Sequence, residues 1–303
     1  MLSHFFALAK SFGVIPAYNI VWMQFVKSVE YKHKYILSYL EKHYSKIISQ
    51  RLCEFPEPDS SPAGCVVWVC WFQGEERMPA TIKCCYESIK KYSGIHEVQL
   101  ITFENYEQFI SLPNHVIEKV ENGSISLTHF SDIIRCNLLA TYGGIYIDAG
   151  LYLSEELHIP QLPFYSIKHK KTNDDVSYVS GYRWIAGFMA GAQGNALHSF
   201  MRDFFNKYWE LNSCLIDYFL VDYVIALAYN TIPIVRKMID DVPYSNPDFY
   251  YLERNLFHPV NKEELEEVFK RTSVFKIGYK NFPEENPNGS LYNYLFKQAN
   301  YEK

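Results

Sequence analysis

The sequence lacks an apolar run long enough to cross a membrane. A membrane-spanning helix needs about 18 consecutive apolar residues or more, and no uninterrupted stretch of this 303-residue chain reaches that length. The N-terminus also lacks the basic segment and the small-residue cleavage site of a secretory leader. We therefore expect a cytoplasmic protein without a membrane-spanning helix.

Motifs that bind zinc or phosphate are missing as well. None of the seven cysteines belongs to a CxxC pair, so no zinc site is expected, and we interpret the cysteines as reduced thiols. The chain contains neither GxGxxG nor GxxxxGK followed by Ser or Thr, the glycine-rich loops with which many enzymes bind nucleotide phosphates. This absence argues against a nucleotidyltransferase or phosphotransferase built on such a loop.

Most of the chain has no surplus of positive charge. The formal net charge is −5 and the pI is about 6.1, and no basic stripe dominates, so a nucleic-acid partner is not expected. The first 51 residues are the exception. They hold seven basic residues against two acidic ones, a surplus of five positive charges.

Aromatic and aliphatic residues accompany these charges within residues 1–54, which we predict to be a helical N-terminal appendage. They are Phe5, Phe6, Leu8, Val14, Ile15, Ile20, Val21, Trp22, Phe25 and Val26. An apolar, aromatic helix face flanked by lysines is typical of a helix that lies on a membrane surface. Pro16 interrupts the stretch, and the same composition fits an appendage that packs on the main domain with its lysines in solvent. The sequence leaves both interpretations open.

The rest of the chain has the pattern of an α/β domain. Residues 55–64 are rich in proline and serine and predict a domain boundary, so we place the main domain at residues 64–303. The pattern predicts a buried strand over 65–72, a helix over 79–92 and a second strand over 97–103. This order is typical of a mostly parallel sheet flanked by helices.

One stretch joins a predicted helix to a predicted strand through two glycines. Thr128 or Ser131 can cap the helix, and the pair Gly143 and Gly144 ends it, one of them in the left-handed conformation. Residues 145–147 then form a buried strand with Asp148 at its carboxyl end. Open α/β sheets bind their ligands at that edge.

The predicted helix places Asp132 and Arg135 on one face, because they are three residues apart. Together with Asp148 they offer a cation and two carboxylates around one crevice. Arginine can neutralise a diphosphate or hold a sugar hydroxyl, and carboxylates accept hydrogen bonds from sugar hydroxyls or bind a divalent ion. Taken singly, the helix pair fits an ordinary ion pair, and it is the ordered combination that predicts a sugar-nucleotide site. We interpret His129 as a local hydrogen-bonding residue rather than a base.

The combination also resembles a known family. Ser131-Asp132-x-x-Arg135, followed by Tyr142-Gly-Gly-Ile-Tyr-Ile-Asp148, is similar to the core motif of glycosyltransferase family 32 and its capsular-polysaccharide-synthesis relatives. Segments at 68–75, 88–91, 97–113, 217–223 and 275–280 follow the family pattern, so the resemblance covers roughly residues 60–295. It implies a GT-A, Rossmann-like fold, a nucleotide-sugar donor that is usually UDP-linked, and retention of anomeric configuration.

Candidate site residues follow from the motifs and the resemblance together. The candidate catalytic residues are Asp132, Arg135 and Asp148. The candidate donor-binding residues are Trp71, Gln73, Gly74, Ser131, Gly144, Lys276 and Lys280. The candidate acceptor or supporting residues are Trp184, Asp217 and Asp222. Each of these side chains also has a purely structural interpretation. The tryptophans are compatible with core packing, Asp217 and Asp222 with a helix cap or an ion pair, and the lysines with solvent-exposed positions.

The sequence departs from the resemblance after the strand. Many relatives carry Asp-x-Asp there, and its second carboxylate binds manganese, whereas this chain has Asp148-Ala149-Gly150. The capsular branch often has Asp-Ala-Thr, so the departure is compatible with that branch. Asp148 is then the candidate ligand for a Mn²⁺ or Mg²⁺ ion, with at most a distant group such as Asp222 to help it.

Two functions are compatible with these observations. The first is a glycosyltransferase that moves a sugar from a nucleotide-sugar donor to a saccharide or lipid-linked oligosaccharide acceptor, in capsular or other surface polysaccharide synthesis, on the inner face of the membrane. The second is a catalytically inactive relative that binds a nucleotide sugar or a partner in a polysaccharide-assembly complex.

Overall fold

A five-stranded sheet forms the centre of the molecule. The computed structural model describes residues 2–26, 29–52, 66–170, 178–278 and 288–297. The sheet has the order β2-β1-β3-β6-β5. Its strands are β1 (Val66–Cys70), β2 (Glu97–Ile101), β3 (Gly144–Ile147), β5 (Phe164–Ser166) and β6 (Phe188–Gly191). Strand β1 runs parallel to β2 and β3, and β6 runs antiparallel to β3 and β5. All strands except β6 therefore point the same way.

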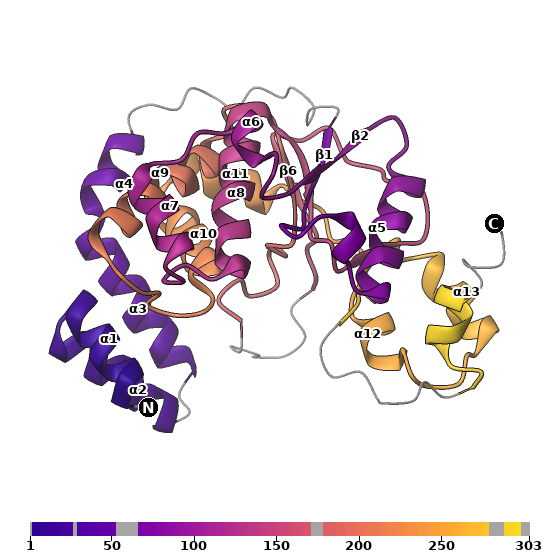
Figure 1. Ribbon diagram of the computed structural model, residues 1–303, viewed down its shortest axis with the longest axis horizontal. Helices are drawn as coiled ribbons and strands as arrows, with labels where there is room; N and C mark the ends of the chain where they lie inside the picture. Colours follow the sequence, from indigo (N-terminus) through magenta and orange to yellow (C-terminus); the bar gives the residue numbers. More distant parts are fainter. Residues whose placement is uncertain (1, 27–28, 53–65, 171–177, 279–287, 298–303) are drawn as a thin grey trace.

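Helices cover both faces of this sheet. They are α5 (Ala80–Tyr92), α6 (Tyr106–Phe109), α7 (Asn114–Glu121), α8 (Leu127–Tyr142), α9 (Ala196–Leu211), α10 (Leu220–Thr231) and α11 (Pro233–Asp240). Helix α5 lies on one side of the sheet, and α8 to α11 lie on the other (Figure 1). The predicted fold class, a mostly parallel α/β sheet flanked by helices, is confirmed.

Helix α9 carries much of the aromatic core. Phe204, Phe205, Tyr208 and Trp209 on this helix are fully buried. Burying side chains of this size contributes a large share of the hydrophobic stabilisation of a domain. The high aromatic content of the sequence thus serves the core on this side of the sheet.

The C-terminal residues, together with β4, form a small lobe on the side of the sheet where α5 lies. Its elements are β4 (Leu151–Leu153), α12 (Tyr251–Asn255), α13 (Lys262–Phe269), β7 (Val274–Lys276) and a π-helical turn (Asn293–Lys297). Strands β4 and β7 pair antiparallel, and a second hydrophobic cluster that includes Leu252, Leu265 and Phe275 holds the lobe together. In Figure 1 this lobe lies at the opposite end of the molecule from the N-terminus.

Four helices precede the sheet domain in the described part of residues 2–52. They are α1 (Leu2–Phe12), α2 (Val14–Val26), α3 (Val29–His43) and α4 (Ser45–Leu52). Helix α3 packs on α10, and α4 packs on α9. Apolar residues of these helices, among them Ile36, Leu40 and Ile48, are buried in the same cluster as the main core. The packing interpretation of the appendage therefore describes α3 and α4.

Polar contacts fasten α3 to the sheet domain. Lys32 Nζ lies 2.9 Å from Asp217 Oδ2, and His33 Nδ1 lies 2.7 Å from the Tyr223 hydroxyl.

Within the parts of the chain that the structure describes, no helix is both long and apolar enough to traverse a bilayer.

Candidate functional site

Helix α8 begins at Leu127, four residues before Ser131, the first candidate site residue of the motif. Ser126 is its N-cap, and the Ser126 hydroxyl accepts a hydrogen bond from the backbone N–H of His129 at 3.3 Å. The predicted caps, Thr128 and Ser131, are wrong because both lie inside the helix. The Ser131 hydroxyl donates instead to the carbonyl of Thr128 at 2.6 Å, which leaves its oxygen able to accept a hydrogen bond from a ligand.

The two glycines after α8 allow the chain to turn sharply into β3. Gly143 and Gly144 have φ values of 68° and 98°, a region that side chains rarely adopt. A Cβ atom at Gly144 would lie 2.6 Å from the carbonyl oxygen of Val66 and 2.9 Å from Nε1 of Trp68. This close approach to β1 explains the glycine without a ligand. Gly144 begins β3, whereas Asp148 follows its other end, so the two candidates do not share a site.

Arg135 lies at the centre of a buried charge cluster. Its Nη2 is 3.0 Å from Asp148 Oδ1 and 3.3 Å from Asp132 Oδ1. Its Nη1 donates to the carbonyl of Ala186 at 2.5 Å, and its guanidinium lies 4.3 Å from the centroid of the Tyr146 ring. The structure therefore brings together the three candidate catalytic residues, which helix α8 and the carboxyl end of β3 supply.

The two carboxylates of this cluster differ in their access to solvent. The side chain of Asp148 is 45% exposed, that of Asp132 11% and that of Arg135 3%. Burial alone would lower the pKa of Arg135, but the charges of Asp148 and Asp132 outweigh it and raise that pKa, so the guanidinium stays charged. Asp148 is thus the member of the cluster with room for a ligand, and the other two hold it in place.

A buried relay fixes Asp132 from behind. The indole Nε1–H of Trp209 donates to His129 Nε2 at 3.0 Å, so Nε2 is the acceptor and the proton of a neutral imidazole lies on Nδ1. Nδ1 is 3.2 Å from Asp132 Oδ2 and donates to it. Because both ring nitrogens are engaged, His129 is a hydrogen-bonding residue of the cluster and has no free nitrogen for use as a base.

Gly187 is a part of the site that the sequence does not reveal. The Asp148 N–H donates to the carbonyl of Gly187 at 2.8 Å, and a Cβ atom at Gly187 would overlap Oδ2 of Asp148. Only glycine leaves space for the carboxylate in this position. A single glycine before the apolar run of β6 gives no signal from which this contact could be predicted.

Asp222 faces the charge cluster from α10. The indole Nε1–H of the buried Trp184 donates to Asp222 Oδ1 at 2.8 Å. Burial raises the pKa of Asp222 to about 6, the bond from Trp184 opposes this rise, and the charges of Asp132 and Arg135 act on the carboxyl as well. Trp184 and Asp222 therefore form one unit beside the cluster.

Asp217 points elsewhere. One carboxylate oxygen binds Lys32 of α3, and the other accepts the backbone N–H of Phe219 at 3.0 Å. Asp217 thus anchors the N-terminal helices, whereas Asp222, five residues later, lies at the charge cluster. Nothing in this position of Asp217 connects it to an acceptor.

The loop after β1 borders the cluster. Since β1 and β3 run parallel, their carboxyl ends meet at one edge of the sheet. Burial raises the pKa of Cys70 at the end of β1, and the charges of Arg135, Asp148 and Asp132 also act on it. The next residues include the partly buried Trp71, the exposed Gln73, and Gly74, whose φ is 85° and which faces open space. The loop therefore lies at the same edge of the sheet as the cluster, and the donor-binding role of its residues stays a prediction.

The C-terminal lobe brings one candidate lysine to the same region. Lys276 of β7 pairs with Leu151 in the strand register, and the Ile277 N–H donates to the Gly150 carbonyl at 3.0 Å. The Lys276 side chain is exposed, and its Nζ lies 5.7 Å from the centroid of the Tyr250 ring. Lys280 lies outside the described residues.

The residues present do not fit a tightly held metal ion. Asp148 Oδ1 is occupied by Arg135, Gly150 has no side chain, and the described residues contain no group of three or more His, Cys, Asp or Glu that could hold a metal. A divalent ion at Asp148 would depend on ligands from a bound substrate.

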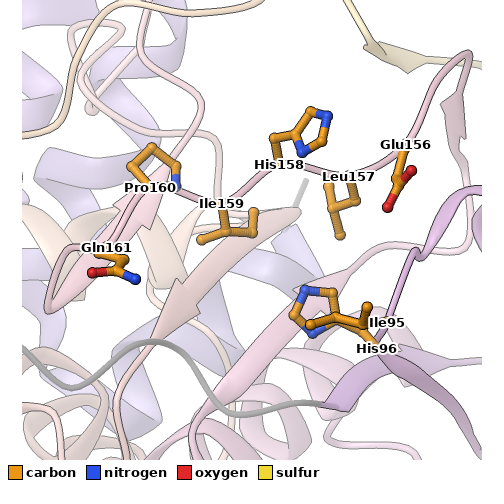
Figure 2. A pocket seen from close by; sticks show the side chains of 8 residues that line it. All are labelled: Ile95, His96, Glu156, Leu157, His158, Ile159, Pro160 and Gln161. Atoms are coloured by element: carbon orange, nitrogen blue, oxygen red, sulfur yellow. The ribbon is translucent and has the colours of Figure 1, made fainter.

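A cavity of about 310 Å³ lies away from the cluster. Figure 2 shows residues 156–161 along one side of it and Ile95 and His96 along the other. Ile95 and His96 precede β2, so the cavity lies at the amino ends of the parallel strands, whereas Asp148 follows the carboxyl end of β3. The cavity has no buried charge, so the chemistry points to the Arg135 cluster as the functional site and not to this cavity.

Comparisons with known proteins place the chain in a family. No curated protein matches it. The solved structure of a protein named PaToxG Glycosyltransferase is 16% identical, over 78% of this chain and 94% of that one, with a TM-score of 0.34, a similarity too low to carry an argument about activity. The sequence profile described as capsular polysaccharide synthesis protein matches residues 18–295, and the chain therefore belongs to the capsular polysaccharide synthesis protein family.

Proposed function

We propose that the chain is a glycosyltransferase of the GT-A type, which transfers a sugar from a nucleotide-sugar donor to a saccharide acceptor in the synthesis of capsular or other surface polysaccharide. The observation that carries the proposal is the Asp132–Arg135–Asp148 cluster at the carboxyl end of β3. Membership of the family supports it, and so does the resemblance of the same motif to glycosyltransferase family 32.

In this proposal Asp148 contacts the donor. Its partly exposed carboxylate accepts hydrogen bonds from hydroxyl groups of the donor ribose or sugar, and such bonds are strong because the acceptor is charged. Arg135 and Asp132 are positioning residues, since they are buried and hold the Asp148 carboxylate in a fixed direction. Preorganised charges of this kind stabilise charge that develops in a transition state.

The donor nucleotide lies against the loop after β1, with Trp71, Gln73 and Gly74 near the base and ribose. Lys276 neutralises part of the charge on the leaving diphosphate. A UDP-linked donor and retention of configuration are the hypotheses that follow from the resemblance. With retention, the acceptor hydroxyl attacks from the side of the leaving group, and no enzyme nucleophile is required.

The acceptor is a saccharide or a lipid-linked oligosaccharide, bound on the side of the cluster where Trp184 and Asp222 lie. Asp222 accepts a hydrogen bond from the attacking hydroxyl group and orients it. No step is assigned to a metal ion, because the described residues do not form a site for one.

The proposal is tested with the purified full-length chain. A thermal-shift panel of UDP-, GDP-, CMP- and dTDP-sugars, each with and without Mn²⁺, identifies the donor, since a bound ligand raises the melting temperature by mass action. Sugar release or transfer from that donor is then measured for wild type and Asp148→Asn. We expect the variant to lose at least about 100-fold in kcat, as for loss of an important electrostatic group. Near-normal turnover by a folded Asp148→Asn variant would contradict the assignment.

The second candidate function is binding without catalysis, and the missing second carboxylate at Gly150 favours it. A donor that raises the melting temperature but is neither hydrolysed nor transferred to any saccharide acceptor would support this alternative. The absence of a response to every donor would count against both functions.

A further inference from the structure

Helix α2 exposes an apolar face to solvent. None of its 13 residues is charged. Val14, Ile15, Tyr18 and Trp22 are 66%, 74%, 56% and 53% exposed. At about 100° per residue these four positions fall within an arc of roughly 100° on the helix surface. They form one continuous stripe, which we call the α2 face.

The opposite side of α2 already has its packing partners. Ala17 and Ile20 are buried, and α2 packs on α1 and α3. The contacts of α3 and α4 with the sheet domain hold the appendage in place. The α2 face is therefore not required to attach the appendage. Contiguous apolar surface of this kind on a soluble protein indicates an interaction site.

The charge of the appendage identifies the kind of partner. Residues 1–51 carry a surplus of five positive charges, and the rest of the chain is acidic. Lys10, Lys42 and Lys46 are exposed on α1, α3 and α4. A second copy of the chain would bring two positive appendages together, which is unfavourable. An anionic surface with an apolar interior is complementary to both the charge and the α2 face.

The aromatic residues on the α2 face fit the same partner. The rings of Tyr18 and Trp22 stack with centroids 6.1 Å apart and an interplanar angle of 11°. Tyrosine and tryptophan are enriched where protein meets the headgroup region of a bilayer, because each ring has an apolar body and a polar edge. Helices α1 and α2 also lie at an outer end of the molecule (Figure 1), where a flat surface can approach them.

We propose that α2 docks the protein on an anionic membrane surface, with Val14, Ile15, Tyr18 and Trp22 inserted at the boundary between headgroups and acyl chains. Docking of this kind needs no membrane-spanning helix. It also does not depend on the proposed transferase activity, and the two proposals can fail separately.

The test measures co-sedimentation of the full chain with two kinds of vesicle. One is phosphatidylcholine with about 30–40% phosphatidylglycerol, enough for a marked negative surface charge, and the other is pure phosphatidylcholine. We expect co-sedimentation with the anionic vesicles that weakens as salt is added. The double variant Ile15→Ser/Trp22→Ser should reduce the partition coefficient at least about tenfold. Its melting temperature should be unchanged, because both side chains are mostly exposed.

A matched control is available at the other side of the molecule. Ile95 is 87% exposed and lies in the loop before β2, so Ile95→Ser removes an exposed isoleucine without touching the α2 face. This control should bind vesicles as wild type does. No binding of wild type to anionic vesicles, or equal loss in the control and the double variant, would overturn the proposal. A soluble oligomer that the double variant dissociates would also overturn it, since the α2 face would then be a protein interface.

Discussion

Replacing Asp222 by asparagine should make the protein more stable at neutral pH. The Asp222 carboxyl accepts a hydrogen bond from Trp184, which an asparagine oxygen can also accept. Burial raises the pKa of Asp222 from 3.8 to about 6 in the folded protein. Between these two values the unfolded chain is ionised and the folded protein is not, so this group contributes most stability below pH 4 and loses it as the pH rises through 6.

The size of the effect follows from the pKa difference. The rise in the pKa of Asp222 from 3.8 to about 6 lowers the free energy of unfolding by roughly 3 kcal/mol at pH 7 and above. At pH 5 the carboxyl is mostly protonated in the folded protein and mostly ionised in the unfolded chain. The same relation then lowers the free energy of unfolding by about 1.6 kcal/mol. Asp222→Asn removes the ionisation, so its gain in stability should be about twice as large at pH 8 as at pH 5.

The assay is urea unfolding followed by tryptophan fluorescence at pH 5, 6, 7 and 8. Asp217→Asn is the matched control, because Asp217 lies five residues away but is paired with Lys32. Loss of that ion pair should destabilise the protein by about 1 kcal/mol instead of stabilising it. An Asp222→Asn variant that is no more stable than wild type at pH 8, or whose gain does not change with pH, would refute the reasoning. A gain accompanied by loss of transfer would identify Asp222 as a residue kept for function at a cost in stability.

Three glycines give further predictions. Gly187→Ala should displace the Asp148 carboxylate and reduce transfer at least about tenfold, with a normal circular dichroism spectrum. The control Gly150→Ala should be tolerated, because its Cβ would be 3.5 Å from the nearest atom. Equal activity of the two variants would count against a role for Gly187. Gly144→Ala should lower the free energy of unfolding by about 2 kcal/mol or more, measured in urea, because of its φ of 98° and its contact with β1. A normally stable Gly144→Ala variant with weakened donor affinity would return Gly144 to the donor site.

Local sequence predicts the centre of the site well, because the relevant residues are close in the chain. The three-residue spacing of Asp132 and Arg135 fixes one helix face, and the glycine pair leads directly into the strand that carries Asp148. Hydrogen-bond geometry decides what the pattern leaves open. The caps predicted for α8 are wrong because the N-cap is Ser126, two residues before Thr128 and five before Ser131. The same motif does not reveal that Gly144 packs on β1.

Contacts between distant segments are the part that the sequence does not predict. Gly187 and Asp148 are 39 residues apart, and their contact depends on the antiparallel pairing of β6 with β3. The separation of Asp217 from Asp222 depends on α3, because only the folded structure brings Lys32 to one of them. In both cases nothing in the local pattern distinguishes a residue of the site from a structural one.

The balance of charge in the cluster leads to a last prediction. Asp132 and Asp148 carry one negative charge more than Arg135 neutralises, and a nucleotide sugar brings a further diphosphate. Positive charge must therefore come from outside the cluster, and Lys276 is exposed close to Gly150 and Leu151. Lys276→Gln should raise the Kd for the donor about tenfold, as for loss of one charge-assisted contact to phosphate.

The effect of Lys276→Gln should also be largest at low salt, since exposed charges are screened as ionic strength rises. The control is Lys270→Gln, which removes an exposed lysine of the same lobe that pairs with Glu267 and should leave the Kd unchanged. If the two variants bind the donor equally well, the compensating charge comes from another source, and a divalent ion carried by the donor diphosphate becomes the better explanation. Titrating Mn²⁺ against the Kd of Lys276→Gln distinguishes the two, because an ion that already neutralises the diphosphate would make the lysine dispensable.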